Sequence, residues 1–152
     1  NTHRHTFDAL RQAWPHRSPA QVLDALLAAH PGDEGKLFAT ARAMGDPARA
    51  TALIEASPGD PKVVLHAAEE EAAVHPARAE RWLFIALGWL ADGRAYKVTR
   101  PIVAQACRLA DALGAQTGER ERLRARLAEV AAKARTAGVH NWVALYLEGA
   151  DE

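Results

Sequence analysis

The chain has 152 residues, of which 49% are hydrophobic and 25% charged, and its formal net charge is zero with histidine neutral. This length fits one domain with a sizeable core, and the balanced charge excludes a global excess that would favour nucleic acids or acidic lipids. The single cysteine, Cys107, excludes an intrachain disulfide, and a lone thiol without a secretory signal favours a cytoplasmic protein. Because the chain begins with Asn1, a piece of a longer polypeptide is an alternative to a complete protein.

Short polar breaks containing Pro, Gly or Asp separate segments rich in Ala, Leu, Arg and Glu, which are good helix formers. No stretch alternates β-branched with polar residues, so strands are not expected. The predicted fold is all-α, a single domain over residues 1–152 built from about eight or nine helices that stack as antiparallel hairpins in an α-solenoid. The helices are expected near residues 3–14, 19–30, 34–44, 47–56, 61–74, 77–91, 100–113, 119–137 and 141–148.

Helix starts are predicted where a side-chain oxygen precedes proline. Ser18, Asp46 and Asp60 each do so, which lets the oxygen accept an amide hydrogen bond at the N-cap while Pro occupies the first turn. Pro76 is expected to begin a helix in the same way without a good cap before it. The glycines expected to stop helices in a left-handed conformation are Gly45, Gly93, Gly114 and Gly138.

An internal repeat is indicated by two pairs of matching segments. ALLAAHPGD (25–33) and ALIEASPGD (52–60) agree at six of nine positions and lie 27 residues apart. PARA at 47–50 recurs at 76–79, a distance of 29 residues. A recurring helix–turn–helix unit of this size is typical of stacked hairpins, each of which buries its apolar face against its neighbours.

The segment KLFATARAMGDPARATALIEASPGD (36–60) resembles a tetratricopeptide unit. It has a first helix, a Gly-Asp turn, and a second helix that places Ala50 and Leu53 inward. Residues 61–91 resemble a second, degenerate unit, so the likeness extends over residues 19–91. The spacing of 27 to 29 residues departs from the family's 34, and bulky residues early in the first helix are missing. The resemblance implies a protein-interaction scaffold and names no partner.

ERWLFIALGWL (80–90) is the most apolar stretch of the chain. Its uninterrupted apolar run is far shorter than the roughly twenty residues of a membrane-spanning helix, so no membrane insertion is expected. The segment is apolar almost all round, which predicts a helix in the centre of the core. Each indole N–H also needs a partner, so Trp82 and Trp89 are kept as candidates for lining a binding groove.

The last two helices are predicted from their apolar spacing. In segment 119–137 the apolar stripe comprises Leu123, Leu127, Val130 and Ala134. The opposite, solvated face comprises Arg122, Arg126, Glu129 and Lys133, the last two spaced as an i,i+4 ion pair. Segment 139–147 is expected to dock as a lid with Trp142, Leu145 and Tyr146 inward.

Catalytic chemistry has few candidates. Ser18 and Ser57 each precede Pro, which assigns both to structural roles, and Cys107 falls on the inner face of its helix, where a thiol is inert. The segment ALGAQTGER lacks the Lys-Ser/Thr signature and the preceding strand of a phosphate-binding loop. No catalytic residue and no cofactor are therefore predicted.

HAAEEEAAVH contains two pairs with metal-ligating chemistry, His66 with Glu70 and Glu71 with His75. The two pairs lie on different sides of one helix, so one ion cannot reach all four side chains without a second helix. A solvated acidic face is the preferred interpretation, and no metal site is predicted.

A basic region follows in the second half of the chain. Arg94, Lys97 and Arg100 surround Tyr96, and four arginines stand between residues 120 and 126. Cations interleaved with an aromatic side chain can follow a nucleic-acid backbone. The four arginines spread round their helix, however, and neighbouring glutamates dilute them, so a solvated face is favoured and nucleic-acid binding is the third hypothesis.

The sequence thus predicts a non-catalytic protein–protein interaction or scaffolding module. A partner peptide or helix would pack on a concave surface formed by the first helix of each hairpin. A helical accessory or regulatory domain of a larger enzyme is the alternative. The residues expected on the binding surface are Arg42, His66, Glu70, Trp82 and Trp89.

Overall fold

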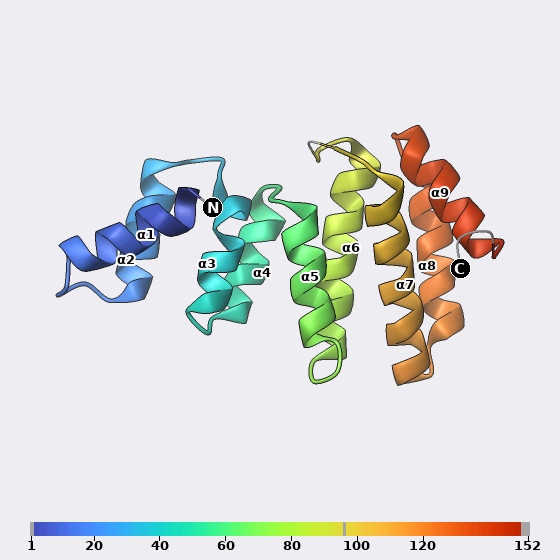
Figure 1. The fold of residues 1–152 in the computed structure, drawn as a ribbon, viewed down its shortest axis with the longest axis horizontal. Coiled ribbons are helices and arrows are strands. Elements are labelled where there is room, and N and C mark those ends of the chain that lie inside the picture. Colours follow the sequence, from blue (N-terminus) through green and yellow to red (C-terminus); the bar gives the residue numbers. More distant parts are fainter. Residues whose placement is uncertain (1, 96, 150–152) are drawn as a thin grey trace. The chain divides into compact units, whose positions relative to one another are not determined.

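The computed structural model describes residues 2–95 and 97–149 of the chain, and Tyr96 therefore lies outside the described residues. Within these ranges the chain forms nine α-helices and one 3₁₀ helix, with no β-strand (Figure 1). The predicted all-α class and number of helices are confirmed. None of the helices in the described part is long and apolar enough to cross a membrane.

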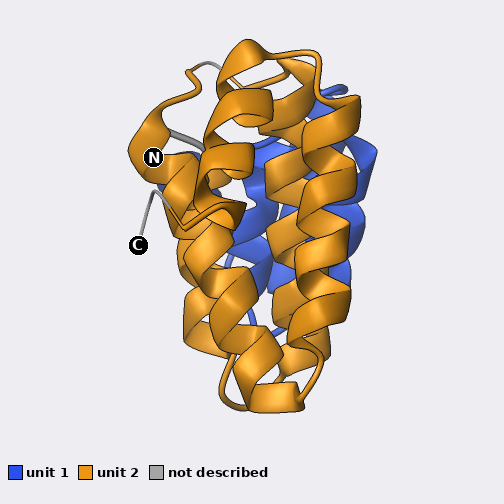
Figure 2. Cartoon of the chain, turned by 90° about the vertical axis from the view of Figure 1, so that its right-hand side faces the viewer, with its two compact units in different colours: residues 1–60 blue, residues 61–152 orange. Residues whose placement is uncertain are grey.

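The helices group into two compact units, residues 1–60 and residues 61–152, which Figure 2 colours separately. A single domain over the whole chain stays a prediction. The first unit contains α1 (Thr2–Ala13), α2 (Pro19–Ala29), the 3₁₀ helix η1 (Glu34–Leu37), α3 (Phe38–Ala43) and α4 (Pro47–Ala56). The second contains α5 (Pro61–Glu71), α6 (Pro76–Asp92), α7 (Arg100–Thr117), α8 (Arg120–Lys133) and α9 (Ala137–Leu147).

In the first unit, α1 packs on α2 and α3, and α3 packs on α4. Phe7, Leu23 and Phe38 are among its fully buried side chains. An ion pair between Arg49 and Asp24 connects α4 to α2. The predicted helix near residues 34–44 is divided, because its first turn is the 3₁₀ helix η1.

A close backbone approach holds η1 against the turn that follows α4. A Cβ atom added to Gly35 would collide with the carbonyl oxygen of Ser57, and one added to Gly59 would collide with that of Gly35. The buried amide of Gly35 donates a 2.9 Å hydrogen bond to Ser57 Oγ. Only glycine fits at both positions. Ser57 therefore has the structural role predicted for it, because it is the C-cap residue of α4 and its hydroxyl also makes this tertiary contact.

The two Pro-Gly-Asp turns that match in sequence differ in conformation. Gly32 adopts a left-handed backbone with φ of 89°, and a Cβ there would meet nothing within 4 Å. Gly59 is not among the glycines with positive φ, and it is required by its contact with η1. The same Pro-Gly-Asp sequence thus needs glycine for two different reasons. The sequence match between the two turns does not extend to their backbone conformation.

In the second unit, α5 packs on α6, α7 packs on α8, and α9 packs on both α7 and α8. Helices two apart along the chain also touch, since α5 contacts α7 and α6 contacts α8. Gln105 of α7 donates a 3.0 Å hydrogen bond to Glu69 of α5. Stacked hairpins produce contacts of this kind, although an α-solenoid stays a prediction.

Two of the predicted N-caps are confirmed by hydrogen bonds. Ser18 Oγ accepts a bond of 3.2 Å from the amide of Gln21, and the side-chain oxygen of Gln21 accepts one of 2.9 Å from the amide of Ser18. Asp46 accepts a 3.0 Å bond from the amide of Arg49. The helix at Pro76 begins without a side-chain cap, as expected.

The predicted helix stops are only half correct. Gly45 and Gly93 adopt left-handed conformations with φ of 77° and 72°. Gly114 lies inside α7, where a Cβ would collide with the backbone at the start of α8, and Gly138 lies inside α9. The actual C-cap of α7 is Gly118, with φ of 73°. In a sequence, a glycine needed for close packing looks the same as one needed to end a helix.

The apolar stripes of the last two helices differ from their predictions by about one position. α8 ends at Lys133, so Ala134 lies beyond it, and the buried stripe comprises Leu123, Leu127 and Ala131. The buried residues of α9 are Val139, Val143 and Tyr146, whereas Trp142 and Leu145 are half-buried. α9 also begins four positions earlier than predicted, at Ala137, and that early start adds Val139 to its packed face.

Candidate functional site on the face of α6 and α8

The arginines at alternate positions of α8 divide into two pairs, each directed at one carboxylate of a neighbouring helix. Residues four apart on a helix share a side, whereas residues two apart do not. Arg122 and Arg126 approach Glu80 of α6, at 2.6 and 3.9 Å. The other pair approaches Asp111 of α7. The spread of the four arginines round α8 therefore serves two ion-pair clusters, while Arg122 and Arg126 remain on the exposed face predicted for them.

The Glu80 cluster combines charge with an aromatic ring. Arg122 lies 2.8 Å from Glu119 as well as close to Glu80, and these two hydrogen bonds raise the pKa of its guanidinium. The guanidinium of Arg126 lies 4.0 Å from the ring centre of Phe84. The two arginine side chains stay 48% and 44% exposed, so solvent screens their ion pairs and the cluster contributes little to stability.

The Asp111 cluster joins three helices. One guanidinium nitrogen of Arg124 lies 3.1 and 3.0 Å from the two carboxylate oxygens, and the other donates a 2.9 Å bond to the carbonyl of Leu147. Arg120 lies 3.6 Å away, and the hydroxyl of Tyr146 donates a 2.6 Å bond to Asp111. The cluster therefore fixes α9 to α7 and α8.

Tyr146 is held as a neutral hydrogen-bond donor by this arrangement. It is 8% exposed, and burial is the main reason why its pKa lies well above the ordinary value. The hydrogen bond to Asp111 raises the pKa further, because a phenolate beside a carboxylate would be repelled. The Asp111 cluster is therefore a joint built around the buried Tyr146, and Arg120 is its exposed member.

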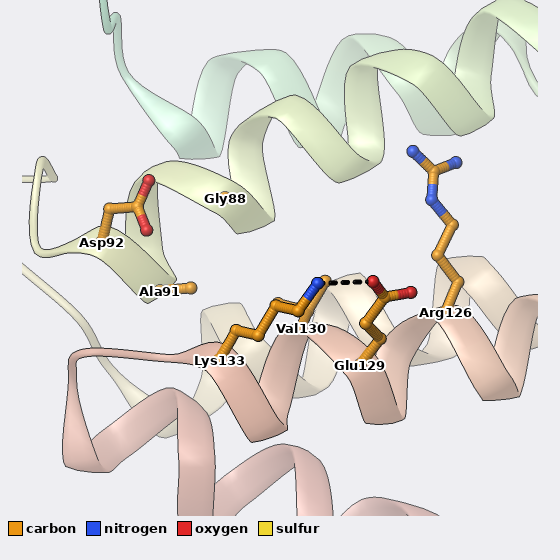
Figure 3. Close-up of a pocket in the computed structure, with 7 residues that line it drawn as sticks. All are labelled: Gly88, Ala91, Asp92, Arg126, Glu129, Val130 and Lys133. Atoms are coloured by element: carbon orange, nitrogen blue, oxygen red, sulfur yellow. Dashed lines mark hydrogen bonds and ion pairs between the residues drawn. The ribbon is translucent and has the colours of Figure 1, made fainter.

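A hollow of about 260 Å³ lies between α6 and α8 (Figure 3). Gly88, Ala91 and Val130 form its apolar part, and a Cβ added to Gly88 would meet nothing within 4 Å. Charged side chains surround this apolar part. Two of them, Glu129 and Lys133, form an ion pair of 2.7 Å, which confirms the predicted i,i+4 pair.

A second hollow, of about 270 Å³, lies at the other end of the same face. Pro76, Ala77 and Glu80 contribute from α6, Leu123 contributes from α8, and the end of α7 adds further residues. The Glu80 cluster stands between the two hollows, because Glu80 and Arg122 line the second and Arg126 lines the first. Two apolar hollows separated by charged groups therefore follow the length of this face.

Trp82 and Trp89 lie in the core, at 0% and 4% exposure. This burial confirms the prediction that their helix is central, since α6 contacts α5, α7, α8 and α9. It also corrects their assignment to a binding surface, because a closed core position leaves neither indole accessible to a partner. The guanidinium of Arg78 lies 6.0 Å from the ring centre of Trp82.

The other three predicted residues are divided between the two units. His66 and Glu70 lie 3.4 Å apart on α5 with side chains that are 71% and 51% exposed. Arg42 is half-buried on α3, in the other unit. Neither hollow on α6 and α8 is lined by any of the five predicted residues. In the described part of the chain, no three His, Cys, Asp or Glu side chains are grouped closely enough to hold a metal ion.

The residues that shape this face were missed, although two signals for them exist in the sequence. Gly88 interrupts a large apolar segment, and an isolated glycine inside a helix has a packing or functional reason more often than a capping one. Glu80 and Phe84 are spaced i,i+4, as are Arg122 and Arg126, so the two helices carry complementary pairs. The pairing of these helices itself could not be inferred from spacing.

No protein-family model, no curated protein and no solved structure matches the chain significantly. The resemblance to tetratricopeptide units therefore stays a prediction, and a functional proposal rests on the geometry of the chain itself.

Proposed function

We propose that the protein is a non-catalytic interaction module that binds a partner peptide or helix along the face of α6 and α8. The observation that carries this proposal is the pair of hollows at the two ends of one exposed helix–helix face. The proposal keeps the predicted function and a cytoplasmic location. The binding surface proposed here lies on α6 and α8, the second helices of their hairpins, whereas the sequence predicted the first helix of each hairpin.

The size of the hollows favours amino-acid side chains over small molecules. Pockets for drug-sized ligands and cofactors hold roughly 300–1,000 Å³, whereas these hollows hold about 260 and 270 Å³ each. Peptide helices bind grooves through a few large anchoring side chains, which fill pockets of this kind. Two such hollows accept two anchors of one partner.

The spacing of the hollows specifies the spacing of the anchors. Glu80 and Phe84 of α6 meet Arg122 and Arg126 of α8, so the two helices follow each other along the face. The residues that line the two hollows are centred roughly twelve positions apart on α6 and roughly eight positions apart on α8. At 1.5 Å per residue these separations correspond to about 12–18 Å. A helical partner would carry its anchors about 8–12 residues apart.

Filling the first hollow from within tests the proposal. Helical peptides are selected from a random library on the immobilised wild-type protein, and their affinities are then measured by fluorescence anisotropy. The variant Gly88→Leu places a side chain in the hollow, and we expect it to weaken binding by about tenfold or more, since a buried anchor carries much of the binding energy. Ala77→Leu is expected to act in the same way at the second hollow.

Gly88→Ala is the matched control. A methyl group at this position meets no other atom and replaces glycine in a helix interior, which stabilises a helix by about 0.5–1 kcal/mol. We expect unchanged peptide affinity and a higher melting temperature. Recovery of no peptide, or of peptides that bind both leucine variants as tightly as the wild type, would contradict the proposed function.

A further inference from the structure

The end of the face at the C-terminus of α6 carries more cations than carboxylates. Arg126 and Lys133 line the first hollow together with Asp92 and Glu129. Two more cations, Arg94 and Arg135, are brought to the same end by the backbone. The amide of Arg94 donates a 2.9 Å hydrogen bond to the carbonyl of Trp89, and the amide of Arg135 donates one of 2.8 Å to that of Ala91.

The two added arginines, like Asp92 at the hollow, have no ion-pair partner among the residues that the structure describes. Both are exposed, and neither side chain has a hydrogen bond or ion pair with any residue in 2–95 or 97–149. Lys133, in contrast, is bound to Glu129 at 2.7 Å, and Arg126 lies over Phe84. Two unpaired arginines against one unpaired carboxylate, Asp92, therefore leave an excess of positive charge at this end of the face.

The dipole of α6 opposes this positive charge only weakly. The carbonyls at a helix C-terminus carry partial negative charge when they are unsatisfied. Here the carbonyl of Ala91 accepts bonds of 2.8 and 3.2 Å from the amides of Arg135 and Thr136. The carbonyl of Leu90 accepts a 2.9 Å bond from the Thr136 hydroxyl. The cations at this end thus keep their attraction for an anion.

We propose that the partner of this face is an acidic amphipathic helix or peptide. One apolar side chain enters the hollow at Gly88, Ala91 and Val130, and carboxylates next to that anchor meet Arg94 and Arg135. This inference rests on the proposed function and adds the charge of the partner to it. Complementary charge raises the association rate and orients the partner, so the positive end fixes the direction in which the peptide lies.

A nucleic acid is the other class of polyanion, and the observations favour it less. Single-stranded nucleic acids bind grooves in which bases stack on exposed aromatic rings. The large rings of α6 do not offer such a platform, because Trp82, Phe84 and Trp89 are at most 8% exposed.

The experiment compares charge reversal at the two arginines with the same change elsewhere. Peptides selected on the wild-type protein are sequenced, and their binding is measured to Arg94→Glu/Arg135→Glu and to Arg108→Glu. Arg108 is an exposed arginine of α7 and serves as the control. We expect peptides with net negative charge, binding that weakens about tenfold in the double variant and falls with salt, and no change in the control.

The outcomes separate the inference from the proposed function. Peptides that lose binding to Gly88→Leu but have no acidic excess, and that bind the double variant normally, would overturn the inference and leave the proposed function intact. A labelled single-stranded oligonucleotide is measured in parallel. If it binds the wild type and Gly88→Leu equally but fails to bind the double variant, the cations serve a nucleic acid and the inference is wrong. Arg94→Gln/Arg135→Gln repeats the test should the reversed variant unfold.

Discussion

Asp111 and Glu80 have nearly the same exposure, 18% and 19%, and each receives two arginines four residues apart on α8. Their partners differ. Asp111 is bound by Tyr146, which is 8% exposed, and by Arg124 and Arg120, whose side chains are 28% and 64% exposed. The arginines at Glu80 are 48% and 44% exposed. The loss in the free energy of unfolding when a carboxylate is removed therefore depends on whether its former partners can bind water instead.

One stretch of sequence thus makes both a buried joint and an open face. The alternation RERLRAR (120–126) sends successive arginines to opposite sides of α8, toward α7 and toward α6. The joint positions α9, and the open face keeps charged groups accessible between two hollows. The proposed binding face of α8 thus lies on a helix whose other side is fixed to α7 and α9.

The largest expected effect is a difference between two matched amide substitutions. Asp111→Asn leaves the Tyr146 hydroxyl and Arg124 without a charged acceptor, and we expect it to lower the free energy of unfolding by about 2–3 kcal/mol. Glu80→Gln leaves arginines that water can solvate, and we expect a loss below about 1 kcal/mol. Urea unfolding followed by circular dichroism measures both. Equal losses would show that partner exposure does not decide the outcome.

Tyr146→Phe is expected to have the next largest effect. It removes only the hydroxyl that donates to Asp111, while the arginines remain, so we expect a loss of about 1.5 kcal/mol in the free energy of unfolding. Combined with Asp111→Asn in a double-mutant cycle, the second substitution should cost much less than it does alone, because the two groups share one bond. Additive losses would mean that the hydroxyl acts independently of the carboxylate.

The raised pKa of Tyr146 predicts a loss of stability at alkaline pH. In the unfolded chain a tyrosine ionises near its ordinary pKa of about 10, whereas the folded state holds the proton to a higher pH. Below that ordinary value the contribution of Tyr146 is fully present. Above it the folded state binds more protons, so the free energy of unfolding falls by up to about 1.4 kcal/mol per pH unit until the folded pKa is passed.

Unfolding free energies measured in steps from neutral to alkaline pH check this prediction. The fall should be shallower in Tyr146→Phe than in the wild type, and Glu80→Gln should keep the wild-type slope. A wild-type slope in Tyr146→Phe would assign the alkaline loss to other groups.

More of the fold than of the candidate site could be predicted from the sequence. Caps such as Ser18 and Asp46 act through neighbours three residues away, so their chemistry is readable in the sequence, and the apolar segment around Trp82 required a core position. The joint at Asp111 depends on groups 13 and 35 residues away, which spacing alone does not bring together.

Trp82 and Trp89 were assigned to a binding surface for a related reason. Tryptophans are frequent in binding sites and in cores, and only the packing of α6 against four helices decides between these roles for Trp89. Gly88, one residue away, lies at the surface and shapes the hollow because it has no side chain. A residue that acts through its missing atoms gives little signal in composition or periodicity.

The smallest expected effect on stability comes from the ion pair beside the first hollow. Glu129 and Lys133 are 63% and 75% exposed, and the bond to Lys133 lowers the pKa of Glu129. The stabilisation is present above the ordinary pKa of a glutamate and is lost as the pH falls through the lowered value, and salt screens it. We expect Glu129→Gln to change the urea midpoint less than Glu80→Gln does.

The same change releases Lys133 at the edge of the hollow, so acidic peptides should bind the variant more tightly than the wild type while the fold is unaltered. A large loss of stability in Glu129→Gln would place this pair with the buried joint at Asp111, and the distinction between the two sides of α8 would then fail.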